Sequence, residues 1–116
     1  MKRPGHSILK IYASSTDRIK SKILYQYITE LASKNEISGA TVYRGIMGFG
    51  QSSKISSSKF WELTEKLPIT IELIDKTEKL EDFYTLIEED LLNMSKGCLV
   101  LIEPVSILLQ KPGKEL

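Results

Sequence analysis

The order of predicted elements constrains the fold of this chain more than any other feature. Residues 7–13 alternate in hydrophobicity with a period of two, as a half-buried strand does. Residues 19–34 then repeat apolar side chains at helical spacing, and residues 40–47 form a second strand rich in Thr, Val, Tyr and Ile. The same order returns further along the chain, with a strand over 67–74, a helix over 78–94 and an apolar strand over 98–102.

Two such strand–helix–strand units predict an α+β protein with the ferredoxin-like order βαββαβ. In this sandwich both helices cover one face of an antiparallel sheet. The polar residues 14–17 are expected to provide the N-cap of the first helix, and Gly97 a left-handed C-cap for the second. Pro104 is expected to end the last strand, and residues 105–109 to form a short fifth strand.

The chain is the size of a single domain, covering residues 1–116 with a core over 7–109. Hydrophobic residues make up 41% of it and charged residues 27%, which is ordinary for a globular protein. The N-terminal end and the polar tail from Gln110 are expected to be flexible. Between the two units, residues 48–58 form a polar loop, and residues 60–66 fit either a short helix or an extension of the next strand.

Composition excludes several classes of function. One cysteine, Cys98, and one histidine, His6, cannot supply the roughly four ligands of a structural zinc site, nor a disulfide within the chain. A formal net charge of +1 disfavours a strongly basic nucleic-acid-binding protein. No apolar run has the length of a signal-peptide core or a membrane span, so a cytoplasmic location is expected. No nucleophile–base set is apparent and the acidic pairs of the second helix fit its solvated face, so neither catalytic residues nor a metal site are expected.

One face of the predicted sheet is left without helices. Large apolar groups and a few charges share this face: Ile8, Lys10, Tyr12, Thr70, Glu72 and Ile74. Such a surface is uncommon on a monomer, because each large aliphatic side chain removed from water contributes roughly 1.5–3 kcal/mol. We expect copies of the chain to pack these faces together, with Lys10 and Glu72 paired near the interface. In the alternative, residues 105–109 of the same chain fold across the face.

The segment from Gly39 to Gln51 is the most informative stretch for function. Its glycines follow a strand and enter the polar loop, with Gly48 and Gly50 on either side of Phe49. Glycine lets backbone N–H groups approach an anion closely, and it permits the positive φ angles at which successive N–H groups form an anion-binding nest. The Phe49 ring fits against either a base or the core. The segment therefore indicates a phosphate-binding loop or, in the alternative, an ordinary tight turn.

This stretch resembles the PII signalling family, in which a Gly-x-Thr-Val strand runs into Gly-Phe-Gly at the base of a long loop. Residues 40–45, with Gly48-Phe49-Gly50 and Ser52-Ser53, are more closely similar to the conserved PII-like family of unassigned function. The resemblance covers residues 7–109. It implies a compact homotrimer with nucleotide sites in the clefts between subunits, and it matches Thr41, Gly48, Gly50 and Gln51 to positions that line the nucleotide in PII proteins.

Cationic residues near this segment are further candidates. Arg44 fits either a phosphate clamp or an ion pair with Glu72 inside the oligomer. Lys96 and Gly97 fit either a phosphate site or the end of the second helix, whose negative pole favours a cation. The candidate nucleotide-binding set is therefore Thr41, Arg44, Gly48, Phe49, Gly50, Gln51, Lys96 and Gly97.

The sequence departs from the PII pattern where phosphates would be bound. Thr70 stands where PII proteins usually carry a phosphate-binding lysine, and the turn before the last strand is reduced to Ser95-Lys96-Gly97. The paired arginines after that strand are missing. An ATP tail carries about four negative charges, which need cations or a metal when they leave water. We therefore expect AMP, ADP or a cyclic adenine nucleotide to be preferred over ATP, and no tightly bound cofactor.

These features predict a non-catalytic PII-like regulatory protein. An adenine nucleotide would bind at the intersubunit cleft, order the loop over residues 50–66, and change the surface offered to an unidentified target protein. By analogy with PII proteins, the target would be a membrane channel or transporter. Two alternatives stay open. One is a nucleic-acid-binding ferredoxin-like domain, which the near-neutral charge and the lack of paired aromatic residues disfavour. The other is a small enzyme that uses the same cleft.

Overall fold

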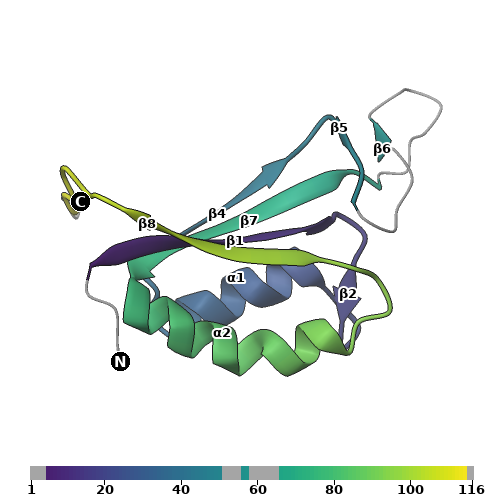
Figure 1. Ribbon diagram of the computed structural model, residues 1–116, viewed down its shortest axis with the longest axis horizontal. Helices are drawn as coiled ribbons and strands as arrows, with labels where there is room; N and C mark the ends of the chain where they lie inside the picture. Colours follow the sequence, from purple (N-terminus) through teal and green to yellow (C-terminus); the bar gives the residue numbers. More distant parts are fainter. Residues whose placement is uncertain (1–4, 51–55, 58–65, 115–116) are drawn as a thin grey trace.

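The computed structural model describes residues 5–50, 56–57 and 66–114 of the chain. Its two layers, a sheet and a pair of helices, consist of β1 (His6–Ser14), α1 (Leu24–Lys34), β4 (Gly39–Arg44), β7 (Pro68–Lys76), α2 (Thr77–Leu92) and β8 (Leu99–Val105). The four strands form one sheet in the order β4-β7-β1-β8, and every neighbouring pair is antiparallel. Both helices lie under the same face of this sheet (Figure 1).

The topology confirms the ferredoxin-like prediction. The connection through α1 joins β1 to β4 across β7, and the connection through α2 joins β7 to β8 across β1. Two short ribbons stand outside the main sheet. One pairs β2 (Arg18–Ile19) with β3 (Lys22–Ile23), and the other pairs β5 (Met47–Gly48) with β6 (Ser56–Ser57).

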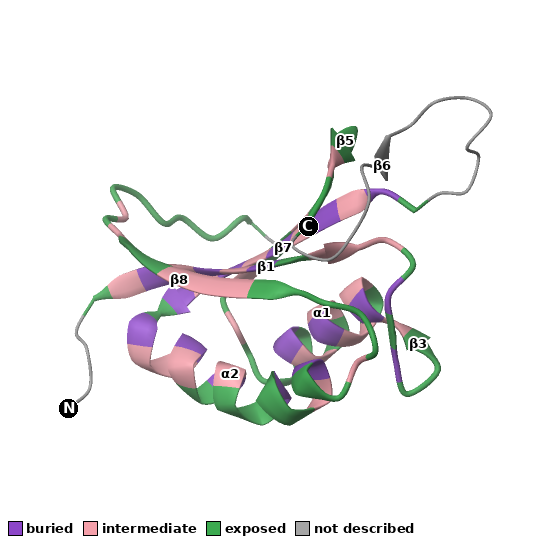
Figure 2. Ribbon diagram, turned by 45° about the vertical axis from the view of Figure 1, so that its right-hand side comes forward, coloured by how far each residue is buried: buried purple, intermediate pink, exposed green. Residues whose placement is uncertain are grey.

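The core lies between the sheet and the helices, as the alternation of the strands predicts. Leu9 and Ile11 of β1 are buried, and so is every second residue of β7 from Ile69 onward. The helices contribute one buried stripe each, which faces the sheet in Figure 2. These stripes consist of Leu24, Ile28 and Ala32 in α1 and of Leu80, Phe83, Ile87 and Leu91 in α2.

The first helix begins later than predicted, at Leu24 rather than Ile19. The preceding residues form the β2–β3 hairpin, whose turn residues Lys20 and Ser21 have φ angles of 52° and 64°. Asp17 does not cap the helix. Its carboxylate accepts a hydrogen bond from the Ser14 N–H at 2.9 Å, and its carbonyl accepts one from the Leu24 N–H at 2.8 Å. The polar turn therefore closes on itself and fixes where α1 starts.

The C-terminal third differs from prediction in three respects. Helix α2 ends at Leu92 with Asn93 as its C-cap, and Gly97 has no positive φ angle, so it is not a left-handed cap. Strand β8 continues through Pro104 to Val105. Proline is tolerated there because β8 is an outer strand of the sheet. The predicted fifth strand over 105–109 does not form, and the side chain of Leu108 is 97% exposed.

Polar contacts join neighbouring elements within each layer. Tyr27 of α1 donates a hydrogen bond to Asp90 of α2 at 2.9 Å, which raises the pKa of the tyrosine. Buried Asp75 at the end of β7 accepts a hydrogen bond from the Ser38 N–H at 2.9 Å, just before β4. Neither helix of the described ranges has the length and apolar character needed to cross a bilayer. Residues 60–65, for which a helix or a strand extension was predicted, lie outside the described residues.

Candidate functional site

The candidate residues gather at one end of the sheet. Because the strands are antiparallel, β1 and β4 end where β7 and β8 begin. The glycine-rich segment leaves β4 at this end, and the connection from α2 enters β8 at the same end, as Figure 1 shows. Segments about 50 residues apart in sequence are therefore brought to one edge of the molecule.

The glycine-rich segment contacts Pro68, the first residue of β7. The Gly45 N–H donates a hydrogen bond to the Pro68 carbonyl at 2.7 Å. A Cβ atom at Gly45 would lie 2.9 Å from Cγ of Pro68, and one at Gly48 would lie 3.3 Å from the same atom. Among the described glycines only Gly5 has a positive φ angle. The described glycines of the segment, Gly39, Gly45, Gly48 and Gly50, therefore lack the positive φ angles expected for an anion-binding nest. Close approach to Pro68 explains Gly45 and Gly48 instead.

Hydrogen bonds hold Pro68 in place from the other side. The Ser15 N–H donates to the Leu67 carbonyl at 2.8 Å, and the Leu67 N–H donates to Oγ of Ser15 at 3.0 Å. Hydrogen bonds therefore join the start of β7 to two segments: the turn after β1, through Ser15, and the end of β4, through Gly45. Sequence reasoning missed this arrangement, and only the Leu67-Pro68 pair before a strong strand pattern hinted at it.

The strand register separates two of the predicted ligands. Thr41 lies opposite Glu72, on the face of the sheet that the helices leave open, and Tyr43 lies on the same face opposite Thr70. Arg44 lies opposite the buried Ile69, in register with the helix-covered face. Thr41 and Arg44 are both exposed, but they extend from opposite sides of β4. The exposed Tyr43 is a neighbour of Thr41 that the sequence analysis did not single out, although period-two spacing from Thr41 would have found it.

The segment beyond Arg44 forms an apolar arm. We use this name for residues 45–49, in which Phe49 is 73% exposed and Ile46 78% exposed. The Phe49 ring, which was predicted to pack against either a base or the core, is therefore not part of the core of its own chain. Met47 and Gly48 pair with Ser57 and Ser56, so part of the predicted loop 48–58 is a ribbon. Gln51 lies outside the described residues.

Lys96 and Gly97 lie exposed in the connection before β8. The outer strands β4 and β8 are separated by β7 and β1, which corresponds to roughly 14 Å between strand axes. One chain therefore does not bring Lys96 next to the apolar arm. Desolvation raises the pKa of the neighbouring Cys98 thiol, and the negative charge of Asp17 adds to this rise.

The open face carries an ion pair in an apolar setting. Lys10 lies directly opposite Glu72, yet its Nζ contacts Oε1 of Glu103 at 2.7 Å, and this hydrogen bond raises the pKa of the lysine. Around the pair lie the side chains of Ile8, Tyr12, Ile74, Leu99 and Leu101, which share the open face by strand register. The expected pairing of Lys10 with Glu72 near an interface between copies stays a prediction.

The chemistry available at this edge is that of anion binding. The exposed groups here that can contact an anion are the Thr41 hydroxyl, the Arg44 guanidinium and the Lys96 ammonium, which a single chain does not bring together. Within the described part of the chain, no three His, Cys, Asp or Glu residues come together as a metal site. Hydroxyl and cationic groups of this kind can contact the oxygen atoms of a phosphate.

Comparison with solved structures defines the class of protein. The fold superposes on CPII from Thiomonas intermedia K12 bound to ADP and bicarbonate, with a TM-score of 0.60, 14% identity and coverage of 90% of this chain and 91% of CPII. A second CPII structure, described as a nitrogen regulatory PII-like protein bound to ADP, AMP and bicarbonate, gives a TM-score of 0.61 at 15% identity. The fold is therefore PII-like, as the sequence resemblance implied.

Sequence comparison then gives the family. Residues 6–107 match the DUF190 family, described as an uncharacterized ACR, and the chain belongs to that family. A UPF0166 protein of Aquifex aeolicus is 32% identical over 101 residues, which cover 87% of this chain and 91% of that protein. The UPF0166 protein MJ1524 of Methanocaldococcus jannaschii is 36% identical over 73 residues, or 63% of this chain and 67% of its own length.

Proposed function

We propose that this protein is a non-catalytic PII-like regulator that binds an adenine nucleotide in clefts between the subunits of a homotrimer. The observation that carries the proposal is the divided site at one edge of the sheet. The apolar arm follows β4 and Lys96 precedes β8 at the same end of the sheet, and within one chain β7 and β1 lie between these two outer strands. A neighbouring copy can complete the cleft, and CPII, which has the same fold, binds ADP and AMP.

The cations near the site favour a short phosphate tail. Arg44 and Lys96 are the candidate cations among the described residues; Arg44 ends the outer strand β4, and Lys96 lies in the connection before the opposite outer strand, β8. Thr70, where PII proteins carry a lysine, lies on the open face and brings no charge. An ATP tail has about four negative charges to compensate, whereas AMP has about two. AMP and ADP are the proposed ligands in preference to ATP.

The proposed output is a change in the surface around residues 50–66. The apolar arm leads into this segment and exposes Ile46, Met47 and Phe49. A nucleotide bound against the arm would favour one arrangement of this surface over another, because it binds the two arrangements with different affinity. The proposed partner is a protein of the kind that PII proteins regulate, a membrane channel or transporter.

The test is titration calorimetry of the full chain with AMP, ADP and ATP, combined with the sedimentation velocity of the same samples. We expect AMP and ADP to bind at least tenfold more tightly than ATP, to a trimer. Lys96→Ala should weaken binding about tenfold, which corresponds to about 1.4 kcal/mol. The matched control Lys22→Ala changes an exposed lysine of β3 and should leave the affinity unchanged. Tighter binding of ATP would overturn the phosphate preference, and no binding of any adenine nucleotide would overturn the proposed function.

One observation favours the alternative of RNA binding. Tyr12 and Tyr43 lie in one row across the open face, with Thr70 between them. Exposed aromatic side chains on an open sheet can stack on bases. The carboxylates of Glu72 and Glu103 on the same face would repel a phosphate backbone. A short single-stranded RNA in the same calorimetric series tests this alternative directly.

A further inference from the structure

We propose that a groove along the outer edge of β8 binds the C-terminal segment of a second copy of this chain, residues 106–111. This inference goes beyond the nucleotide site. It shares with the proposed function only the association of identical chains, and it would stand if the ligand were something other than a nucleotide.

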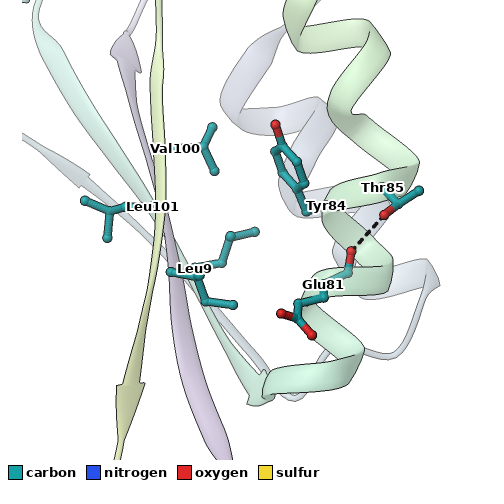
Figure 3. A pocket seen from close by; sticks show the side chains of 7 residues that line it. Leu9, Glu81, Tyr84, Thr85, Val100 and Leu101 are labelled. Atoms are coloured by element: carbon teal, nitrogen blue, oxygen red, sulfur yellow. Dashed lines mark hydrogen bonds between the residues drawn. The ribbon is translucent and has the colours of Figure 1, made fainter. Parts of the chain in front are cut away.

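The groove has a volume of about 410 Å³ and lies between β8 and α2. In Figure 3, Leu9 and Val100 point toward the helix, while Leu101 points away from it on the other side of β8. Tyr84 and Glu81 extend from α2 toward the sheet, and the Thr85 hydroxyl donates a hydrogen bond to the Glu81 carbonyl at 3.1 Å. The outer edge of β8 is thus lined by apolar side chains on both of its faces.

Strand β8 has the position from which a sheet can be extended. It is the last strand in the order β4-β7-β1-β8, and none of the described segments pairs with its outer side. An outer strand with unpaired N–H and C=O groups binds an extended segment by strand addition. Backbone hydrogen bonds then supply affinity, and alternate side chains supply specificity.

The chain's own C-terminal segment has the matching pattern. Ile107, Leu108 and Leu109 follow β8, and the side chains of Leu108 and Leu109 are 97% and 79% exposed in a single chain. In an extended conformation Ile107 and Leu109 point to one side and Leu108 to the other. This alternation matches the groove, which has Val100 and Ile102 on the helix side of β8 and Leu101 on the open side.

Charge also fits this occupant. The described residues after Val105 include Lys111 and Lys114 and no acidic residue. In the extended segment Lys111 falls on the same side as Leu109, and therefore faces α2. Helix α2 contains one basic residue, Lys79, and six acidic residues, Glu78, Glu81, Asp82, Glu88, Glu89 and Asp90.

The segment of the same chain does not fit the groove in this way. If the chain folded back directly after Val105, where β8 ends, through a two-residue turn, Leu109 would lie opposite Pro104 and Lys111 opposite Ile102. A lysine would then occupy the apolar part of the groove, and any longer turn moves the apolar residues further from Val100. A second copy is free of this connection, so its Ile107 and Leu109 can lie beside Val100 and Ile102.

Chemical crosslinking of the full chain tests the proposal. In a Cys98→Ser background, Leu101→Cys and Leu108→Cys place one thiol beside the groove and one on the segment. We expect a short bismaleimide to link separate chains, seen as dimer and trimer bands on a denaturing gel, with a yield that tenfold dilution leaves unchanged. A link within one chain, or no link, would overturn the proposal. The control pair Leu92→Cys with Leu108→Cys uses another exposed leucine and should give little product.

A charge variant gives a second readout. Ile107→Glu combined with Leu109→Glu places two carboxylates against acidic α2, and the dissociation constant for self-association should rise at least tenfold by sedimentation equilibrium. Leu92→Glu is the matched control and should change it less than twofold. Unchanged association of the double variant would overturn the proposal. Loss of crosslinking with AMP binding retained would overturn only the docking of the segment. Crosslinking without AMP binding would overturn only the proposed nucleotide function.

Discussion

One buried side-chain hydroxyl in α1 lacks a hydrogen-bond partner among the described residues. Oγ1 of Thr29 is buried and has no partner among the described residues. Burying an unpaired hydroxyl opposes folding by about 1–3 kcal/mol. We therefore expect Thr29→Val to raise the free energy of unfolding by about 1 kcal/mol, measured by urea denaturation at neutral pH. Thr29→Ser keeps the hydroxyl and should give no gain. A less stable valine variant would show that the hydroxyl is satisfied by water.

At the residue scale, the sequence predicted which positions are near the edge of the sheet but not which way they face. Strand alternation alone would have separated Thr41 from Arg44, because residues three apart on a strand lie on opposite faces. The roles of Gly45 and Gly48 were out of reach, because they depend on Pro68, a residue about 20 positions away. Contacts of this kind are absent from any local pattern.

Glu36, the residue after the C-cap of α1, has a left-handed backbone conformation but is not a glycine. The Ile37 N–H bonds to the Ala32 carbonyl and the Glu36 N–H to the Ser33 carbonyl, the Schellman arrangement, and Glu36 has a φ of 58°. Glycine adopts this conformation without the penalty that a Cβ brings. Glu36→Gly should stabilise the protein by about 0.5–1 kcal/mol in thermal or urea unfolding. Glu36→Ala retains the Cβ and serves as the control. A loss of stability in the glycine variant would contradict this account.

The contact between the apolar arm and Pro68 gives a second prediction at this scale. Gly45→Ala would place a Cβ 2.9 Å from Cγ and 3.3 Å from the carbonyl oxygen of Pro68. We expect this change to lower the free energy of unfolding by about 1–3 kcal/mol. Combining it with Pro68→Ala should recover part of the loss, which a double-mutant cycle would measure as a coupling energy. Gly113→Ala, where nothing lies within 4 Å, is the control. Additive effects of the two changes would contradict the contact.

Elements were predicted well where their periodicity was strong and poorly where a neighbour decided their ends. The buried alternation of β7 and the stripe of α2 match their sequence patterns. The start of α1 was wrong because Lys20 and Ser21 adopt a left-handed turn without a glycine or asparagine to signal it. The end of β8 was wrong because Pro104 is acceptable only in an outer strand, and strand order is a property of the whole sheet.

At the scale of the whole molecule, the open face predicts self-association. Tyr12 is 39% exposed on this face, opposite Leu99 and Thr70. Tyr12→Glu should leave the single chain folded, because the position is already exposed, but should shift sedimentation velocity from the trimer toward the monomer. Leu86→Glu, on the exposed side of α2, should not. If the site is a cleft between subunits, AMP affinity should fall together with the trimer. An unchanged assembly of the Tyr12 variant would contradict packing through this face.

The fold class and the family resemblance followed from the order of the elements and from residues 39–51, and the comparisons confirm both. The candidate site was predictable only as a set of residues at one end of the sheet. In the proposed trimer a second chain would complete the site, and a sequence carries no local signal for the distance between outer strands. The residues predicted to bind nucleotide remain predictions for the titrations described above.

The contact between the apolar arm and Pro68 has a mechanical consequence. Gly45 and Gly48 lie close to the ring of Pro68, the first residue of the central strand β7. Ser15 is hydrogen-bonded to Leu67, the residue before that proline. The arm is thus attached to the start of β7 through contacts at two of its five residues. A force applied at its far end would be transmitted through Pro68 into β7, and from there to β1 and the helices packed beneath it.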